Sequence, residues 1–278
     1  MTVEPARTSH EGGAGRWNGM ARYAAPPAPP TTRRHGATSR RGGVPVTLPP
    51  PTPLPDVLPL PLPDERPDGP HQVLPGVVHV PRWLDHDAQV ALVADFRTWA
   101  RPPAGLRHPR VPTGHVMTVQ SVCLGWHWSP YAYSRTADDT DGAPVTPLPD
   151  HVVALGRAAV AATFGPGEGA DYAPDAAIVN LYPPGAKLGL HQDGEEPAAA
   201  PVVTISIGDT CTFRLAGVDR RTGPFTDVEL RSGDLLVFGG PNRRVFHGVP
   251  RVRTGTAPDG LGLPPGRLSL TLRETGLA

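Results

Sequence analysis

The sequence predicts a mainly β domain with flanking helices, of the sandwich or jelly-roll class, which follows a tail rich in proline, glycine and arginine. Two observations lead to this prediction. Pro and Gly account for 24 of residues 1–70 but for only 46 of the remaining 208. Beyond about residue 165, every apolar run is short and is bounded by Gly, Pro or Asp. Short strands separated by such turn residues are typical of sandwiches and jelly rolls.

The first 70 residues are predicted to be disordered. Proline-rich runs at residues 26–30 and 49–63 favour polyproline II and offer little apolar surface to bury. Residues 71–278 are then expected to form one domain, which is long enough to bury a sizeable core.

The charge of the domain limits the ways in which it can bind nucleic acid. Residues 71–278 carry 18 basic and 20 acidic side chains, a net charge of −2. This balance excludes a globally basic surface, so any nucleic-acid binding must rest on a local face.

Cysteine content and hydropathy point to an intracellular protein. Cys123 and Cys211 cannot build a disulfide framework, and no Cys-x-x-Cys pair is present for zinc, so we expect two buried thiols. No apolar stretch is long enough for a membrane helix, and the N-terminus has no apolar signal core. We therefore expect a cytoplasmic protein, with nothing in the sequence that demands more than a monomer.

Two helices and one strand are expected in the first half of the domain. Residues 77–83 form an apolar run that predicts a strand, and Asp85 can cap a helix over residues 86–100. Apolar residues in this helix and in a second one, over residues 151–163, recur at helical spacing. They are Val90, Leu92, Val93 and Phe96 in the first helix, and Val152, Val153, Leu155 and Val160 in the second.

Six further strands are predicted, over residues 176–182, 202–207, 211–215, 227–231, 235–239 and 267–273. The last alternates strictly, which places Arg267, Ser269, Thr271 and Arg273 on one face and three leucines on the other. A solvent-exposed face would explain this pattern. An interior face would require anionic partners for two arginines, and a dicarboxylate such as 2-oxoglutarate can supply them.

His191 and Asp193 form a His-x-Asp pair, which a chain of this composition can contain by chance. The pair is therefore evidence for a metal site only if its structural setting supports one. On a strand, residues two apart face the same side and can bind one metal ion. His247, which follows the strand over residues 235–239, can add a third ligand. Two His and one carboxylate form the facial triad of non-haem Fe(II) sites. The alternative for His247 is a histidine hydrogen-bonded at a strand end.

The segment from Asn180 to Asp193 reads Asn-Leu-Tyr-Pro-Pro-Gly-Ala-Lys-Leu-Gly-Leu-His-Gln-Asp. It resembles the signature of the AlkB family of Fe(II)/2-oxoglutarate-dependent dioxygenases. The similarity continues through residues 232–234, 239–240 and 247–248 and ends in residues 267–273, so that it covers roughly residues 75–278. The resemblance implies a double-stranded β-helix (jelly roll) core.

The resemblance also implies the residues of the catalytic centre. His191, Asp193 and His247 would be the catalytic iron ligands. The residues expected to bind the cosubstrate are Asn180, Tyr182, Arg267, Ser269 and Arg273, with Ser269 standing where the family usually has an asparagine.

The substrate side is similar to the family's nucleotide-recognition segment. Leu124-Gly125-Trp126 is followed by Tyr131 and Tyr133. Trp126 and Tyr131 would border the damaged base or its adjacent phosphate, since unstacked bases bind to aromatic faces. Glu195 and Arg220 would approach the base. The alternative is a set of surface-loop aromatic residues with no ligand.

The function implied by the resemblance is oxidative demethylation of N-alkylated bases, of the 1-methyladenine and 3-methylcytosine type, in single-stranded DNA or RNA. Such an enzyme acts in DNA repair, uses Fe(2+), O₂ and 2-oxoglutarate, and releases succinate, CO₂ and formaldehyde. One alternative is a 2-oxoglutarate dioxygenase that hydroxylates a protein, a lipid or a small metabolite. Another is a non-catalytic jelly roll that binds a metal or a sugar, although such a module has no use for two clustered arginines.

Overall fold

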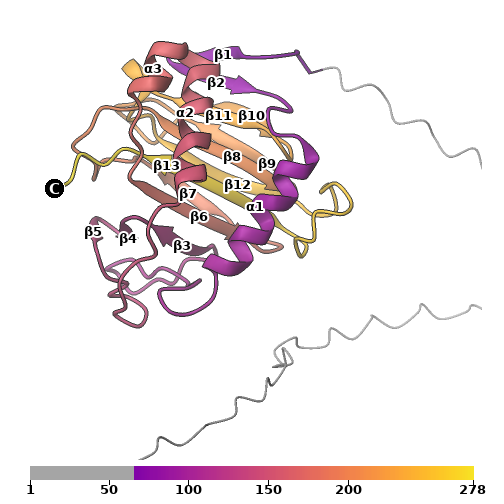
Figure 1. Ribbon diagram of the computed structural model, residues 1–278. Coiled ribbons are helices and arrows are strands. Elements are labelled where there is room, and N and C mark those ends of the chain that lie inside the picture. Colours follow the sequence, from indigo (N-terminus) through magenta and orange to yellow (C-terminus); the bar gives the residue numbers. More distant parts are fainter. Residues whose placement is uncertain (1–65) are drawn as a thin grey trace, which may run out of the picture. The chain divides into compact units, whose positions relative to one another are not determined.

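The computed structural model describes residues 66–278, which form two facing antiparallel sheets with helices on one side (Figure 1). Residues 1–65, most of the predicted tail, lie outside the described residues. The larger sheet has the strand order β1 (His71–Leu74), β2 (Val77–Val80), β11 (Leu235–Phe238), β8 (Val202–Gly208), β13 (Arg267–Arg273), β6 (Ala176–Tyr182) and β3 (Gln120–Leu124). The smaller sheet has the order β10 (Thr226–Leu230), β9 (Thr210–Leu215), β12 (His247–Arg253) and β7 (Leu188–His191). The predicted jelly-roll core is confirmed.

Three helices and a separate hairpin complete the domain. Helix α1 (His86–Trp99) begins where predicted, because the Asp85 carboxylate accepts a hydrogen bond of 2.8 Å from the Ala88 backbone N–H. Helix α2 (Asp150–Phe164) is one residue longer at each end than predicted, and the short α3 (Pro166–Asp171) follows it. The β4 (His127–Ser129) and β5 (Ala132–Ser134) strands form the hairpin, and η1 (Gly240–Asn242) is a 3₁₀ turn.

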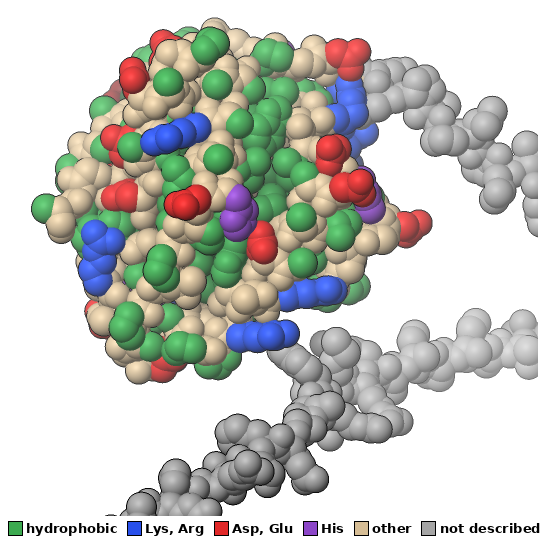
Figure 2. All heavy atoms as spheres, viewed as in Figure 1, with side chains coloured by type: hydrophobic (Ala, Val, Ile, Leu, Met, Phe, Trp, Pro, Cys, Tyr) green, Lys and Arg blue, Asp and Glu red, His purple; other side chains and the backbone are tan. Residues whose placement is uncertain are grey.

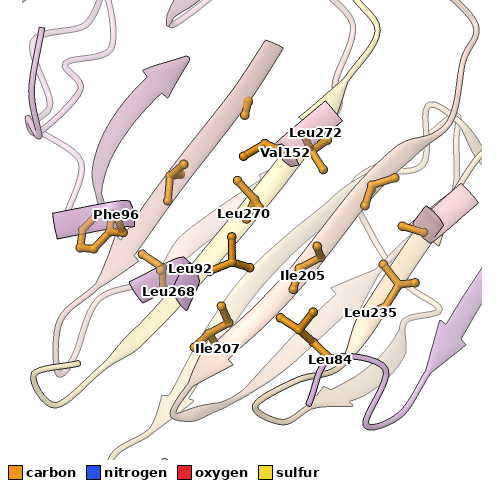
Figure 3. Close-up of a cluster of buried hydrophobic side chains, with 14 of the residues drawn as sticks. Leu84, Leu92, Phe96, Val152, Ile205, Ile207, Leu235, Leu268, Leu270 and Leu272 are labelled. Atoms are coloured by element: carbon orange, nitrogen blue, oxygen red, sulfur yellow. The ribbon is translucent and has the colours of Figure 1, made fainter. Parts of the chain in front are cut away.

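A hydrophobic cluster fixes the helices on the outer face of the larger sheet (Figure 3). Leu268, Leu270 and Leu272 of β13 pack there with Phe96 of α1 and Val152 of α2. Because strand residues alternate, the polar side chains of β13 face the smaller sheet instead. All of them are buried. The polar stripe of β13 is therefore an interior face of the jelly roll, and it lies opposite the strands that carry the two candidate histidines.

The predicted strand over residues 77–83 ends earlier, at Val80. Pro81 has no N–H to donate to a neighbouring strand, and Arg82 has a φ of 53°, which an extended strand does not allow. β1, β3, β4, β5, β7, β12 and α3 were not predicted. Most of them are short or interrupted by Gly or Pro, so their periodicity is weak.

The remaining sequence expectations concern thiols, charge and membrane spans. Cys123 and Cys211 are free and buried, as predicted. On the face shown in Figure 2, basic and acidic side chains are scattered rather than gathered into one basic patch. Among the helices of residues 66–278, none combines the length and apolar character that crossing a bilayer requires.

Candidate active site

The two candidate histidines lie directly opposite each other on neighbouring strands. His191 is the last residue of β7, His247 is the first of β12, and the two are paired in the antiparallel register. Gly248 allows this close pairing, because a Cβ there would lie 2.8 Å from the Leu188 carbonyl oxygen. Asp193 lies two residues beyond the end of β7, so it reaches the site from a loop and not from the strand face that the sequence suggested.

His191, Asp193 and His247 form a cluster of possible metal ligands whose ligand atoms all lie within 4.8 Å of one another. His191 Nδ1 is 2.9 Å from the Gly189 carbonyl oxygen and His247 Nδ1 is 3.0 Å from that of Val245. A carbonyl only accepts, so each Nδ1 carries the proton and each Nε2 keeps a free lone pair. Both imidazoles are therefore in the tautomer that binds a metal through Nε2.

The environment of Asp193 fits a metal ion. Its Oδ2 is buried, has no hydrogen-bond partner and lies 3.8 Å from His247 Nε2. Burial opposes ionisation, but the Arg273 guanidinium, together with the neighbouring His247 and His191, brings the pKa of the carboxyl well below its usual range. Burial and the neighbouring His191 also lower the pKa of His247 to about 4. A carboxylate with two imidazoles that each offer an Nε2 lone pair is the donor set that suits Fe(II).

Arg273 is buried directly behind the metal-ligand cluster. Its Nη2 donates a hydrogen bond of 2.7 Å to Asp193 Oδ1. Its Nη1 donates to the Tyr133 hydroxyl at 2.8 Å and to Glu196 Oε1 at 3.0 Å. The Nε of Arg273 is buried without a partner, which leaves one donor for a further anion.

Arg267 occupies the other end of the polar stripe on β13 and is fully buried, with an exposed fraction of 0%. Its Nε donates to Ser206 Oγ at 2.9 Å and its Nη2 to Ser269 Oγ at 3.4 Å, whereas Nη1 has no hydrogen-bond partner. The guanidinium lies 5.0 Å from the centre of the Tyr182 ring. A buried cation with an unused donor fits a carboxylate ligand.

A small cavity lies between the two sheets and connects Arg273 with the two histidines. Burial raises the pKa of Tyr182 to about 12 against the opposing effect of Arg267, so its hydroxyl remains a donor. Asn180 accepts a hydrogen bond of 2.6 Å from Ser121 on β3. The cavity is lined by residues of both sheets, among them Asn180, Tyr182, His191, His247, Ser269 and Arg273. Arg267 lies behind Tyr182 and is not part of this lining.

A larger cleft of about 440 Å³ opens from the metal-ligand cluster to the surface, and His191, Asp193 and Arg273 form part of its wall. Its outer wall combines aromatic, cationic and acidic side chains, namely Trp128, Tyr131, Lys187, Glu195 and Arg221. Tyr131 is 73% exposed and has a φ of 73°, a left-handed conformation that is rare for a tyrosine. The β4–β5 turn thus presents an aromatic ring at the cleft, at a cost in backbone strain.

Comparison with known proteins agrees with this geometry. Residues 76–273 match the model of the 2OG-Fe(II) oxygenase superfamily. The dioxygenase AlkB of Salmonella typhimurium is 35% identical over 191 residues, which cover 66% of this chain and 84% of that protein. The chain is an AlkB-like member of this superfamily.

Two ALKBH1 proteins are also similar to this AlkB-like chain. ALKBH1D of Arabidopsis thaliana, named as a DNA N(6)-methyladenine demethylase, is 36% identical over 225 residues, which cover 73% of this chain. The chain spans about half the length of this plant relative. The solved structure of OsALKBH1 superimposes with a TM-score of 0.66 at 33% identity and covers 73% of this chain and 100% of that one. Superfamily membership implies Fe(II) as cofactor, with 2-oxoglutarate and O₂ as cosubstrates.

Two predicted substrate residues of the AlkB-like domain do not line the cleft. Trp126 is only 6% exposed, its indole donates to Asp175 Oδ2 at 3.1 Å, and the Arg135 guanidinium stacks on its ring. Trp128 lines the cleft in its place. Arg220 is exposed beside the cleft, and it is the adjacent Arg221 that contributes to the lining.

The sequence analysis did not single out Glu196, the buried carboxylate that binds Arg273. Glu196 has no exposed side-chain surface, and its Oε2 accepts a hydrogen bond of 3.3 Å from Arg243. The sequence carries one signal for this residue, because two adjacent acidic residues follow the His-x-Asp pair. The signal does not identify the partners of Glu196, since its two arginines come close to it only in the folded chain. Glu195, in contrast, is half-buried and lines the cleft.

Proposed function

We propose that this protein is an Fe(II)/2-oxoglutarate-dependent demethylase that acts on N-alkylated bases, of the 1-methyladenine and 3-methylcytosine type, in single-stranded DNA or RNA. The observation that carries the proposal is the unpartnered Asp193 Oδ2, which lies beside two Nε2 lone pairs at the base of a cleft with aromatic walls. AlkB-like membership adds the reaction class, and the name of the relative ALKBH1D refers to a methylated base in DNA.

Each group at the site has a role in this proposal. His191, Asp193 and His247 hold the metal, while the free donors of Arg267 and Arg273 bind the carboxylates of 2-oxoglutarate. When bound, iron with O₂ and 2-oxoglutarate supplies the oxidation of the N-methyl group to a hydroxymethyl group, and succinate, CO₂ and finally formaldehyde are released. The cleft excludes bulk water and orients the methyl group toward the metal.

The cleft wall supports a cationic, unstacked base as substrate. Trp128 and Tyr131 offer aromatic faces, and base–aromatic stacking contributes about 1–3 kcal/mol per base. Glu195 lies in the same wall and favours a positively charged base by Coulomb attraction. Lys187 and Arg221 supply positive charge for the phosphates of the strand.

The test is a panel of single-stranded DNA and RNA oligonucleotides that each carry one methylated base, incubated with iron and O₂ and with or without 2-oxoglutarate. The panel includes 1-methyladenine, 3-methylcytosine and N6-methyladenine, the last because of the relative's name. We expect 2-oxoglutarate-dependent demethylation and formaldehyde release for the first two bases, and no turnover with Asp193→Ala.

Failure on every methylated base, together with succinate formation on adding a protein, lipid or metabolite extract, would overturn the proposal in favour of a different hydroxylase. Absence of a charge-transfer band with Fe(II) and 2-oxoglutarate without O₂ would instead indicate a non-catalytic jelly roll. Full formaldehyde release by Asp193→Ala would contradict the metal-ligand assignment.

A further inference from the structure

Arg273 divides its donors between two buried carboxylates. Nη2 donates to Asp193 Oδ1, while Nη1 is held by Glu196 Oε1 and by the Tyr133 hydroxyl. Arginine and a carboxylate often form two parallel hydrogen bonds when nothing prevents it. Here the other terminal nitrogen, Nη1, is already occupied by Glu196 and Tyr133, and Asp193 Oδ2 keeps no hydrogen-bond partner.

Glu196 is itself held rigidly in this arrangement. Its Oε1 accepts a hydrogen bond of 2.5 Å from the Tyr133 hydroxyl, and its Oε2 accepts one from Arg243. Arg243 also donates to the backbone carbonyl oxygen of Asp193 at 3.1 Å. Two guanidiniums and two carboxylates therefore balance in charge within one buried cluster. Removing the Glu196 charge would leave both arginines facing Asp193 alone.

We propose that Glu196 and Tyr133 are positioning residues of the metal centre: they hold Nη1 of Arg273 away from Asp193, so that the two terminal nitrogens of Arg273 do not both bind Asp193 and Oδ2 stays available to the metal. The inference rests on the metal site of the proposed function. Without these two residues, Coulomb attraction draws Arg273 onto both Asp193 oxygens, where it competes with the metal.

Tyr133 connects this cluster to the substrate side. It belongs to β5, in the hairpin whose other residues Trp128 and Tyr131 line the cleft. The Tyr133 hydroxyl thus links the hairpin to Arg273, which donates a hydrogen bond to the candidate metal ligand Asp193. Loss of the hydroxyl acts on metal affinity even though Tyr133 is not a ligand.

The experiment measures Co(II) binding to the full-length, metal-free protein by calorimetry, without cosubstrate or substrate. We expect Glu196→Gln and Tyr133→Phe each to weaken Co(II) affinity, with about a tenfold loss for Glu196→Gln, as for other partners of metal ligands. Tyr172→Phe is the control, because Tyr172 is a buried tyrosine of the same domain and its hydroxyl has no hydrogen-bond partner. It should bind Co(II) like the wild type.

A rescue variant separates positioning from a merely structural role. Arg273→Lys in the Glu196→Gln background replaces the forked guanidinium with a single ammonium, which cannot cover two oxygens in parallel. Affinity should recover toward the wild-type value. No recovery of affinity in the double variant, or wild-type affinity in both single variants, would overturn the inference.

Wild-type protein that binds no Co(II) would instead overturn the metal site of the proposed function. Tyr133→Phe keeps the ring, so it tests the inference if Glu196→Gln does not fold.

Discussion

Arg267 is a fully buried cation that keeps one unused hydrogen-bond donor for a carboxylate. Ser206 and Ser269 hold two of its nitrogens and leave Nη1 unused. Arg267→Lys keeps the positive charge but loses the planar guanidinium with its parallel N–H donors. We therefore expect the KM for 2-oxoglutarate to rise about tenfold, equivalent to about 1.4 kcal/mol. Steady-state kinetics with varied 2-oxoglutarate measure this rise. Co(II) affinity should stay unchanged, and an unchanged KM would remove Arg267 from the cosubstrate site.

His247 should make the stability of the metal-free protein depend on pH. Burial lowers its pKa to about 4 from 6.5, so the unfolded chain binds more protons between these values. The free energy of unfolding therefore falls as the pH drops from about 6.5 toward about 4, by at most about 1.4 kcal/mol per pH unit for this one group. Burial lowers the pKa of His71 and His127 as well, and both act in the same direction.

Urea denaturation across this pH range, with wild-type protein and His247→Gln, isolates the contribution of the one histidine. The free energy of unfolding of the variant should fall less steeply on acidification, since it keeps only two of the three histidines with a lowered pKa, His71 and His127. Parallel curves for the two proteins would show that His247 is not kept neutral by burial.

Single residues also show where prediction from sequence stops. Both Trp126 and Trp128 are aromatic residues of the recognition segment, and the resemblance points to Trp126. Gly125 has a φ of 76° and begins a turn, so the alternation restarts at β4 and Trp128 comes to face the cleft. A Cβ on Gly125 would lie 1.9 Å from the Asp175 carbonyl oxygen. That contact with a residue 50 positions away has no signal in the local sequence.

At the scale of elements, the β7–β12 pair sets the distance between the two histidines. Gly248→Ala would force a Cβ against the backbone at Leu188 and Gly189 and separate the strands. We expect a lower Tm and weaker Co(II) binding, measured by calorimetry. Gly189→Ala on the facing strand is the control, since nothing lies within 4 Å of its added Cβ and both quantities should stay near wild type. Equal behaviour of the two variants would contradict the role given to Gly248.

The predictability of the strands follows from their side chains. β6 and β13 have the predicted bounds, because long alternating runs such as that of β13 have only one arrangement that buries their leucines. β7 and β12 were missed, since one is short and half-exposed and the other contains Gly248 and Pro250. The candidate ligand residues were predicted from motif spacing and resemblance. Their supporting residues were not, because Arg273 meets Glu196 and Tyr133 only through the fold.

For the whole molecule, the proposed domain boundary at residue 70 can be tested by truncation. Arg66 Nη1 lies 2.5 Å from the buried Asp234 Oδ2, so contacts of the domain begin before the predicted start at residue 71. Removing residues 1–65 should leave Co(II) binding and Tm unchanged. Removing residues 1–70 also deletes Arg66 and should lower Tm by about 2–4 °C for each 1 kcal/mol lost. Loss of metal binding in the shorter deletion would show that the tail belongs to the catalytic unit.

The amino-acid composition places a chemically unique side chain in the cleft wall. Lys187 is the only lysine among the 26 basic side chains of the sequence, and it is an exposed part of the cleft wall. Apart from the α-amino group, an amine-directed acylating reagent therefore has one target in this protein. Covalent labelling of Lys187 attaches a reporter beside the candidate metal centre without any engineered cysteine. Shielding of that single amine by a bound strand would read out occupancy of the cleft directly, as the yield of one modified peptide.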